Sequence, residues 1–339
     1  MTGMIEPITD PGSIEPEVVV TETVDGKQQS VHGRSPGQMA WIRLKRDRTA
    51  RVTGALILGI LLAAYGVPLW TAIYGTDAYA HNPDLLDRSS VPLGFVGVSG
   101  SHWLGILQGN GEDVLMQLLT GMRTSLTISI ICAILATAIG AIIGATAGFL
   151  GGWVDAVINW IIDVMLSLPF LIVALAAFPI MQEVFFGGPS ERPLILSGLM
   201  VTGILLIFGW VGTARLTRGQ VISLREREFI EAARASGAGN WHIIFKQILP
   251  NVWAPILVSF SMAVPGFVGF QAYLAFLNIG VGHPHPDLGR LVNFAVGKMQ
   301  GLNGWFLLVI SGGTIFLLVL TFNLFGDAVR DALNPKSNR

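Results

Sequence analysis

Six stretches of this sequence are long and apolar enough to cross a lipid bilayer. Each holds about 20 mainly apolar residues, and at roughly 1.5 Å per residue this covers the roughly 30 Å of bilayer hydrocarbon. Only 13% of the residues are charged, against 52% hydrophobic, whereas about a quarter is usual in globular proteins. The sequence therefore predicts an all-α, polytopic integral membrane protein with spans near residues 52–74, 126–150, 157–180, 194–214, 253–277 and 305–325.

The positions of Lys and Arg predict the orientation of the chain. Successive connections between spans lie on alternating sides of the membrane. On that basis sixteen of the 21 Lys and Arg residues fall on one side: before the first span, between the fourth and fifth spans, or after the sixth. Cytoplasmic connections retain positive charge. We therefore expect both termini, including residues 326–339, on the cytoplasmic side of the cell inner (plasma) membrane.

The first 51 residues differ from the spans. Residues 1–38 contain several prolines and acidic residues but no aromatic residue, which is typical of a disordered tail. They lack the basic start and short apolar core of a cleaved signal. Residues 39–51 are expected to form an interfacial helix, with Ser35 as its cap and Pro36 in its first turn; a flank that only fixes topology is the alternative. Residues 52–125 then hold the first span and an outer loop.

A polar segment interrupts the spans at residues 228–251, "EFIEAARASGAGNWHIIFKQILPN". Ser223 and Glu226 have the spacing of a capping box and are expected to start its first helix. Gly237 is suited to the left-handed conformation that ends such a helix. At 100° per residue one arc of this helix is apolar and rich in small residues, namely Phe229, Ile230, Ala232 and Ala233.

A second helix is expected after the Gly-Ala-Gly turn. Asn240 is its predicted cap, and Pro250 is expected to stop it. Its apolar face would comprise Trp241, Ile244, Phe245 and Ile248. A simple polar connector lying on the membrane would explain the amphipathic pattern, but it would not explain small residues and a specific turn together.

These residues resemble the cytoplasmic loop of the membrane subunits of binding-protein-dependent ABC importers. The matching positions, at the family's spacing, are Glu231, Ala232, Ala233, Gly237, Leu249 and Pro250. The family's usual isoleucine two residues before the leucine is replaced by Gln247, with Ile248 one position later. The resemblance implies that this loop couples the permease to a cytoplasmic ATPase, with a short helix seated in a groove of that subunit.

Further motifs resemble the second permease of dipeptide, oligopeptide and nickel importers. They are "HWLG" at 102–105, "DVLMQLLTGMRTSL" at 113–126, "GGWVDAVINWIIDVMLSLP" at 151–169 and "FNLFGDAVRDALNPK" at 322–336. The resemblance implies a type I ABC importer permease fold, with a permease core at 126–325 and a coupling loop at 215–251. The implied partners are a homologous permease subunit, two ATP-binding subunits and an extracytoplasmic peptide-binding protein, in a lipid membrane. No cofactor and no nucleic acid are expected.

Three departures from the family pattern leave the substrate open. Residues 106–113, "ILQGNGED", lack an arginine that is common in the family. Trp160 stands where relatives often have arginine, and Leu288 where a tryptophan is usual. An ABC permease for nickel or another small solute is therefore an alternative to a peptide permease.

A few polar residues in apolar surroundings need separate interpretations. Asp163 lies within the third predicted span, where a charge is costly, and a structural partner is favoured over a proton relay. His283 and His285 are interpreted as part of a proline-stiffened outer loop, because two histidines without further ligands are weak evidence for a metal site. Cys132, the single cysteine, is expected to be a small packing residue.

No nucleotide-binding or catalytic motif is present. The sequence has no Gly-x-x-x-x-Gly-Lys-Ser/Thr, so the chain is not expected to bind ATP through a P-loop. A membrane-embedded enzyme is disfavoured because no catalytic constellation is seen. An ion-coupled secondary transporter stays an alternative, although Asp163 would be its single ionisable candidate near the midplane.

Overall fold

The computed structural model describes residues 20–24, 27–31, 36–187, 193–299 and 301–334. One small sheet, β1 (Val20–Val24) and β2 (Lys27–Val31), precedes the helices. The helices up to and including the first long span are α1 (Pro36–Arg46), α2 (Arg48–Tyr65), α3 (Val67–Tyr74), η1 (Pro83–Leu85) and α4 (Val114–Leu150). The remaining helices are α5 (Gly152–Ser167), α6 (Phe170–Phe186), α7 (Leu194–Gly209), α8 (Val211–Leu224), α9 (Glu228–Ala235), α10 (Asn240–His242), η2 (Ile243–Ile248), α11 (Leu249–Asn251), α12 (Trp253–Phe276), α13 (Leu288–Gly297) and α14 (Leu302–Leu333).

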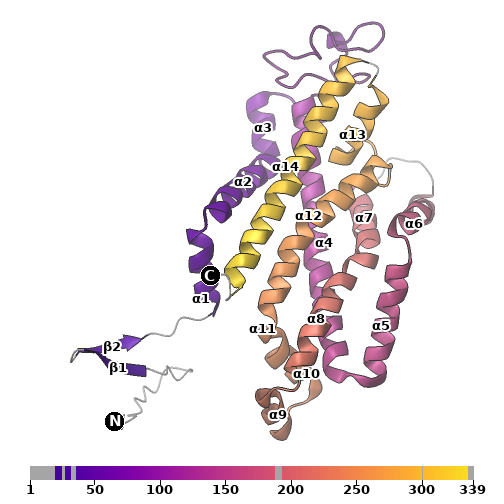
Figure 1. Cartoon of the computed structure of the whole chain (residues 1–339). Coiled ribbons are helices and arrows are strands. Elements are labelled where there is room, and N and C mark those ends of the chain that lie inside the picture. Colours follow the sequence, from indigo (N-terminus) through magenta and orange to yellow (C-terminus); the bar gives the residue numbers. More distant parts are fainter. Residues whose placement is uncertain (1–19, 25–26, 32–35, 188–192, 300, 335–339) are drawn as a thin grey trace.

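Long helices form one elongated bundle around α4 (Figure 1). α4 contacts α8, α12, α7, α5 and α2, while α14 packs on α12, α13 and α2. The main core fills the space between these helices and includes the fully buried side chains of Met116, Leu126 and Leu274. The prediction of an all-α membrane protein is confirmed for the spans.

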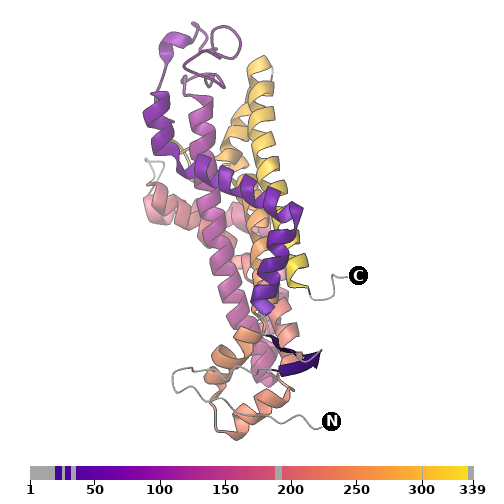
Figure 2. The same ribbon diagram turned by 90° about the vertical axis from the view of Figure 1, so that its left-hand side faces the viewer.

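Among the described residues, five helices are long and apolar enough to cross a membrane, or six if a bent pair counts as one span. That pair is α5 and α6, which meet at an angle of 87°. The span predicted at 157–180 is therefore broken by a bend. Leu168 has extended backbone angles, φ −79° and ψ 126°, because the residue before a proline, here Pro169, is disfavoured in the α region. α6 consequently runs across the bundle rather than along it (Figure 2).

The second span begins twelve residues before the predicted start at 126. Asp113 caps α4 by accepting a hydrogen bond from the Met116 backbone N–H at 2.9 Å. Its other carboxylate oxygen lies 2.7 Å from His102 Nδ1 in the outer loop, and both side chains are buried. The outer loop is thus fixed to the start of α4 by a polar contact from which water is excluded.

The N-terminal segment departs from its prediction in three places. The interfacial helix expected at 39–51 is α1, which ends at Arg46, and Asp47 then caps α2 through a 2.7 Å hydrogen bond from the Ala50 N–H. Gly66 separates α2 from α3 within the first predicted span. Part of the tail predicted as disordered forms the antiparallel pair β1–β2; the Val and Thr residues of β1, VTETV, favour a strand. Ser35 and residues 1–19 lie outside the described residues.

Candidate functional site

The fourth span extends into the region predicted as the coupling loop, 215–251. α8 continues to Leu224, ten residues beyond the expected end of the fourth span at 214. Ser223 therefore lies inside a helix, and its hydroxyl donates to the Gln220 carbonyl at 2.8 Å. The predicted capping box of Ser223 and Glu226 is wrong: α9 starts at Glu228, with Arg227 at the cap position and no side-chain cap bond.

α9 is amphipathic, as expected, but only part of its apolar arc is covered. Ile230 is fully buried and Ala233 is half-buried, whereas Phe229 and Ala232 are exposed. Glu228 and Glu231 lie in the first turn, where negative charge is favourable beside the free backbone N–H groups. Glu231 and Ala232 are thus presented to solvent at the end of the molecule where α9 lies (Figure 1).

The turn after α9 confirms the predicted left-handed glycine. Gly237 has φ +80°. Its N–H donates to the Arg234 carbonyl at 2.9 Å, and the Ala238 N–H donates to the Ala233 carbonyl at 3.0 Å. This pair of bonds is the Schellman arrangement, which satisfies the last carbonyls of a helix and fixes the direction in which the chain leaves it.

The second arm of the loop is one continuous helical rod made of α10, η2 and α11. Gly239 stands at the cap position, and Asn240, the predicted cap, is the first helical residue. η2 is a π-helix, a wider coil than the α-helix. Pro250 does not stop the rod at once: the rod ends one residue later, at Asn251.

A small hydrophobic cluster joins this loop to the C-terminal ends of α4 and α8. Its buried members are Ala145, Phe149, Val221, Ile230, Ile243, Ile244, Ile248 and Val252. Ala233, Ala238 and Leu249 pack against it. In addition the Arg234 guanidinium lies 4.9 Å from the centre of the Phe149 ring, a cation–π distance. The loop is therefore a folded unit seated on two spans.

The predicted coupling residues do not form a single patch. Glu231, Ala232 and Gly237 are exposed, while Ala233 and Leu249 point into the cluster. Leu249 and Pro250 lie on α11, nearer the bundle than α9 (Figure 1). Trp241 and Phe245 were predicted to share an apolar face with Ile244 and Ile248, but they stack on each other at 6.0 Å and are 60% and 45% exposed.

A glycine stripe on α4, which was not among the predicted features, brings α8 into backbone contact. A Cβ at Gly140, Gly144 or Gly148 would lie 2.5, 2.3 and 2.8 Å from the backbone oxygens of Trp210, Ala214 and Arg218. Glycines four residues apart are the typical signal for close packing of membrane helices. This spacing is visible in the sequence, and it makes α4 and α8 a rigid pair above the loop.

Two ion pairs connect α5 to α8. Arg218 binds Asp155 with both Nε and Nη2, the latter at 2.7 Å from Oδ2, and both side chains are partly buried. Arg215 Nη2 donates to Asp163 Oδ1 at 2.7 Å. The structural partner predicted for Asp163 is therefore present.

Neither a metal nor a cofactor site is apparent in the part of the chain that the structure describes. No group of three or more His, Cys, Asp or Glu residues is placed to hold a metal ion there. His285 packs edge-on against Tyr79, with ring centres 6.5 Å apart. Cys132 is fully buried among core residues.

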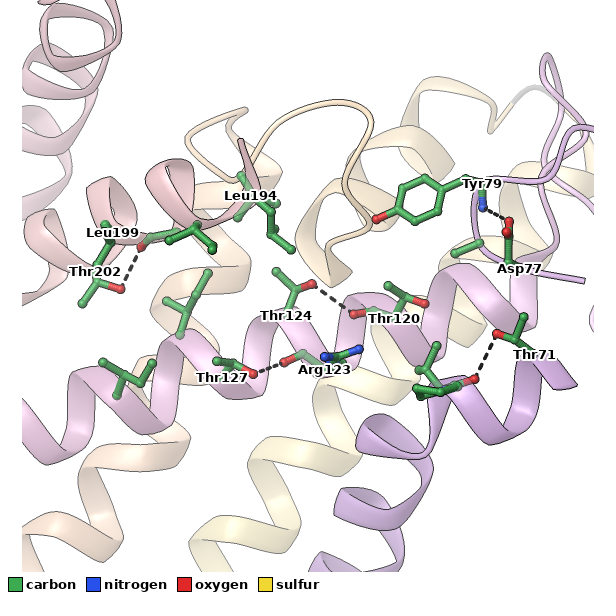
Figure 3. A pocket seen from close by; sticks show the side chains of 18 residues that line it. Thr71, Asp77, Tyr79, Thr120, Arg123, Thr124, Thr127, Leu194, Leu199 and Thr202 are labelled. Atoms are coloured by element: carbon green, nitrogen blue, oxygen red, sulfur yellow. Dashed lines mark hydrogen bonds between the residues drawn. The ribbon is translucent and has the colours of Figure 1, made fainter. Parts of the chain in front are cut away.

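The outer half of the bundle contains a cavity of about 760 Å³ between α3, α4 and α7. Figure 3 shows Arg123 and three threonines of α4 along one wall, Leu194 and Leu199 of α7 along another, and Asp77 and Tyr79 from the outer loop at the rim. This cavity lies far from the predicted coupling residues, at the opposite end of α4.

Comparison with known proteins covers nearly the whole chain. Residues 137–339 match the family described as "Binding-protein-dependent transport system inner membrane component", and residues 35–87 match "N-terminal TM domain of oligopeptide transport permease C". The chain is 35% identical over 303 residues to the dipeptide transport system permease protein DppC of Alkalihalophilus pseudofirmus, covering 89% of this chain and 90% of that protein.

Two further relatives are permease proteins of other transport systems. The glutathione transport system permease protein GsiD of Pectobacterium atrosepticum is 34% identical, with 89% of this chain and 92% of that protein covered. The oligopeptide transport system permease protein OppC of Escherichia coli K12 is 32% identical, with 93% and 97% covered.

A solved structure shows the same fold. A chain of the MetNI methionine ABC transporter in an inward-facing conformation matches with a TM-score of 0.51 and 18% identity, covering 64% of this chain and 96% of that one. Together with the turn at Gly237 and the bundle around α4, these matches establish the chain as a member of the family of membrane permeases of binding-protein-dependent ABC importers, of the peptide-transporting type.

Proposed function

We propose that α9 and the turn at Gly237 are the surface through which this permease is driven by a cytoplasmic ATPase. The single observation that carries the proposal is the Schellman turn at Gly237, because it holds α9 at a fixed angle to the α10–η2–α11 rod. An exposed helix can transmit a displacement only if its connection to the spans is stiff. The cluster around Ile230 and Phe149 supplies that stiffness.

The path of the displacement follows the tightest packing in the bundle. A movement of α9 reaches Val221 of α8 and Phe149 of α4 through the shared cluster. The glycine contacts at Gly144 and Gly148 then oblige α4 and α8 to move together. Closure of the ATPases would rock these helices as one body, a switch between two packings of rigid elements.

The proposed assembly contains a homologous permease subunit, two ATP-binding subunits and an extracytoplasmic peptide-binding protein. The relatives are named as permease proteins of dipeptide, glutathione and oligopeptide transport systems, which supports this composition. The chain itself would hydrolyse no ATP and would form half of the pathway for peptides, with the other half supplied by the second permease.

Both termini are proposed to be cytoplasmic, in the inner membrane. The Arg43 guanidinium donates to the Asn334 carbonyl at 3.2 Å, so α1 and the end of α14 lie together, toward the end of the bundle where α9 lies (Figure 1). In intact cells Asn240→Cys should be shielded from impermeant thiol reagents and Asn110→Cys should be labelled. Labelling of Asn240→Cys from outside would reverse the orientation.

The coupling proposal is tested with tryptophans at two adjacent alanines. Ala232 is exposed, so Ala232→Trp should block docking while leaving the loop folded. Ala233 packs on the cluster, so Ala233→Trp should instead disrupt the loop itself. Ser89→Trp adds a tryptophan at an exposed position of the outer loop and controls for the added side-chain volume.

The measurement is ATPase activity of the purified transporter with and without loaded binding protein. Ala232→Trp should reach the membrane at normal levels, retain binding-protein affinity and lose the stimulated activity. Full stimulation and full peptide uptake in Ala232→Trp would rule out docking at this surface.

A further inference from the structure

The charged residues that line the cavity between α3, α4 and α7, Asp77 and Arg123, lie toward its outer end, and the deeper lining is uncharged. Arg123 is followed on α4 by Thr127, Ile128 and Ile131, and the rise along the helix from Arg123 to Ile131 is about 12 Å. Val67 and Pro68, at the start of α3, line the same cavity. The long axis of the slot is thus parallel to the spans, and its polar end is on the outer-loop side (Figure 3).

Arg123 is the cationic hydrogen-bond donor that lines the slot. The hydroxyls of Thr71, Thr124, Thr127 and Thr202 donate to backbone carbonyls of their own helices at 2.7 to 3.1 Å and cannot donate to a ligand at the same time. Within the described residues no carboxylate forms an ion pair with Arg123. Its guanidinium is exposed and stands three residues before the apolar run that starts at Leu126.

Asp77 supplies the opposite charge at the same rim. One of its carboxylate oxygens accepts the Tyr79 backbone N–H at 2.8 Å (Figure 3), which leaves the second oxygen for a ligand. Burial raises the pKa of the Tyr79 phenol, and the charges of Arg290, Asp77 and Arg123 all act on it. The rim therefore presents a cation and an anion to the same small region.

We infer that this slot binds one phospholipid of the outer leaflet with an ethanolamine headgroup. The phosphate would meet Arg123, the primary ammonium would meet Asp77, and an acyl chain would lie against Pro68, Ile128 and Ile131. Arginine binds phosphate through two parallel N–H bonds, and an ammonium with three N–H donors suits a carboxylate acceptor. The volume of about 760 Å³ is within the range of small-molecule sites.

A peptide fits the slot less well than a lipid. Its backbone C=O groups would lie against Val67, Pro68 and Ile128 without donors, since the neighbouring threonine hydroxyls already donate to backbone carbonyls. Each buried and unpaired polar group carries a desolvation cost. An acyl chain has no such groups.

The experiment measures lipid retained by the assembled transporter. The complex is purified from nanodiscs of equal parts phosphatidylethanolamine, phosphatidylglycerol and phosphatidylcholine, delipidated with detergent, and analysed by mass spectrometry. We expect retained phosphatidylethanolamine in preference to the other two. Arg123→Gln should lower retention by about tenfold, as expected for loss of a charge-assisted hydrogen bond, whereas Arg123→Lys should keep most of it.

Two glycines of α7 provide a matched pair for the acyl slot. Gly198 lines the cavity, and its Cβ would be 4.0 Å from Ile128, so Gly198→Leu should fill the slot and displace the lipid. Gly203 has open space around it and does not line the cavity, so Gly203→Leu should retain lipid like the wild type. Asp77→Asn should reduce the preference for phosphatidylethanolamine over phosphatidylcholine.

Three results would overturn the inference. The first is equal retention in wild type, Arg123→Gln and Gly198→Leu. The second is displacement of the lipid by peptide and loaded binding protein, which would assign the slot to cargo. The third is an efficient cross-link from Ile195→Cys, on the exposed wall of the slot, to the second permease, which would show that protein fills it.

Discussion

Arg215 Nη2 lies 2.7 Å from Asp163 Oδ1, and this bond joins α8 to α5 within segments that are apolar enough to be spans. The two side chains are 55% and 69% exposed in the isolated chain. A charged side chain at mid-bilayer costs roughly 2.5–3.5 kcal/mol on insertion scales, so this face is unsuited to lipid. We therefore predict that it meets either the second permease or water in the transport pathway.

The accessibility of position 163 to a water-soluble reagent tests whether this face meets lipid. In a Cys132→Ala background, Asp163→Cys should react with a water-soluble thiol reagent in vesicles that hold the assembled transporter, because thiolate forms only where water reaches. Val309→Cys, on α14 and 69% exposed with apolar neighbours, is the control and should stay unreactive. Protection of Asp163→Cys in the complex but not in the isolated chain would place the second permease over this face, and no reaction in either would contradict the prediction.

Gly144 should be intolerant even of alanine. A Cβ there would sit 2.3 Å from the Ala214 carbonyl oxygen, so α8 would have to move away from α4. Overpacking of this kind costs about 1–3 kcal/mol, more than the roughly 1 kcal/mol that Gly→Ala gains in a helix interior. Gly144→Ala should therefore lower the thermal stability and the membrane level of the complex.

Gly219→Ala is the matched control for that substitution. Gly219 lies on α8, and nothing lies within 4 Å of the position that a Cβ would take there, so alanine should be neutral or slightly stabilising. If Gly144→Ala and Gly219→Ala unfold at the same temperature, the glycine stripe does not set the contact between the two helices.

The spans and the turn at Gly237 were predictable from sequence because each depends on local chemistry. A bilayer requires an apolar run, and a left-handed turn requires a residue without a Cβ. The family resemblance of the 228–251 segment then identified the loop. These features do not depend on what packs against them.

The errors concern features that tertiary packing decides. Ser223 had the local pattern of a helix start, but the fourth span continues past it to pack on α4. Ala233 and Ala232 were grouped on one arc, yet only Ala233 reaches the cluster under α9. The bend at Leu168 had a local signal in Pro169, whereas its angle of 87° depends on the surroundings of α6.

Asp287 should make the stability of the outer end depend on pH. It is buried at the start of α13, where it caps the helix through the Gly289 N–H at 2.8 Å and accepts from the Gln271 amide. Burial raises its pKa from 3.8 to about 6, against the lowering effect of the Gly289 and Gln271 hydrogen bonds. Because the pKa of Asp287 is higher in the folded state, protonation of this carboxyl stabilises the fold. This contribution is complete below pH 3.8 and is lost as pH rises through about 6.

Asp287→Asn should therefore gain stability relative to the wild type as pH rises from about 5 to about 7.5, by roughly 1.4 kcal/mol. Asparagine keeps the cap on Gly289, and its amide can donate to Gln271 Oε1, which is buried without a partner among the described residues. Thermal unfolding across this pH range measures the effect. Asp287→Ala should be less stable than Asp287→Asn at every pH, and parallel pH curves for wild type and Asp287→Asn would show that the carboxyl does not titrate there.

Gly237 tests whether the loop must be stiff to couple. Its φ of +80° is strained for any residue with a Cβ, by roughly 1–2 kcal/mol and more for a β-branched side chain. No atom lies within 4 Å of a Cβ at this position, so a substitution acts through backbone conformation alone. Gly237→Val should therefore change the angle between α9 and the second arm without affecting insertion of the spans.

Gly237→Asn is the matched control, because asparagine adopts the left-handed conformation more readily than other residues with a Cβ. Peptide uptake and ATPase stimulation by loaded binding protein should be lost in Gly237→Val and largely kept in Gly237→Asn, at equal membrane levels. Since both substitutions add bulk at the same exposed point, a difference between them isolates the turn conformation. Wild-type uptake in Gly237→Val would mean that α9 can transmit the displacement through a flexible connection, and that the Schellman turn is not required for transport.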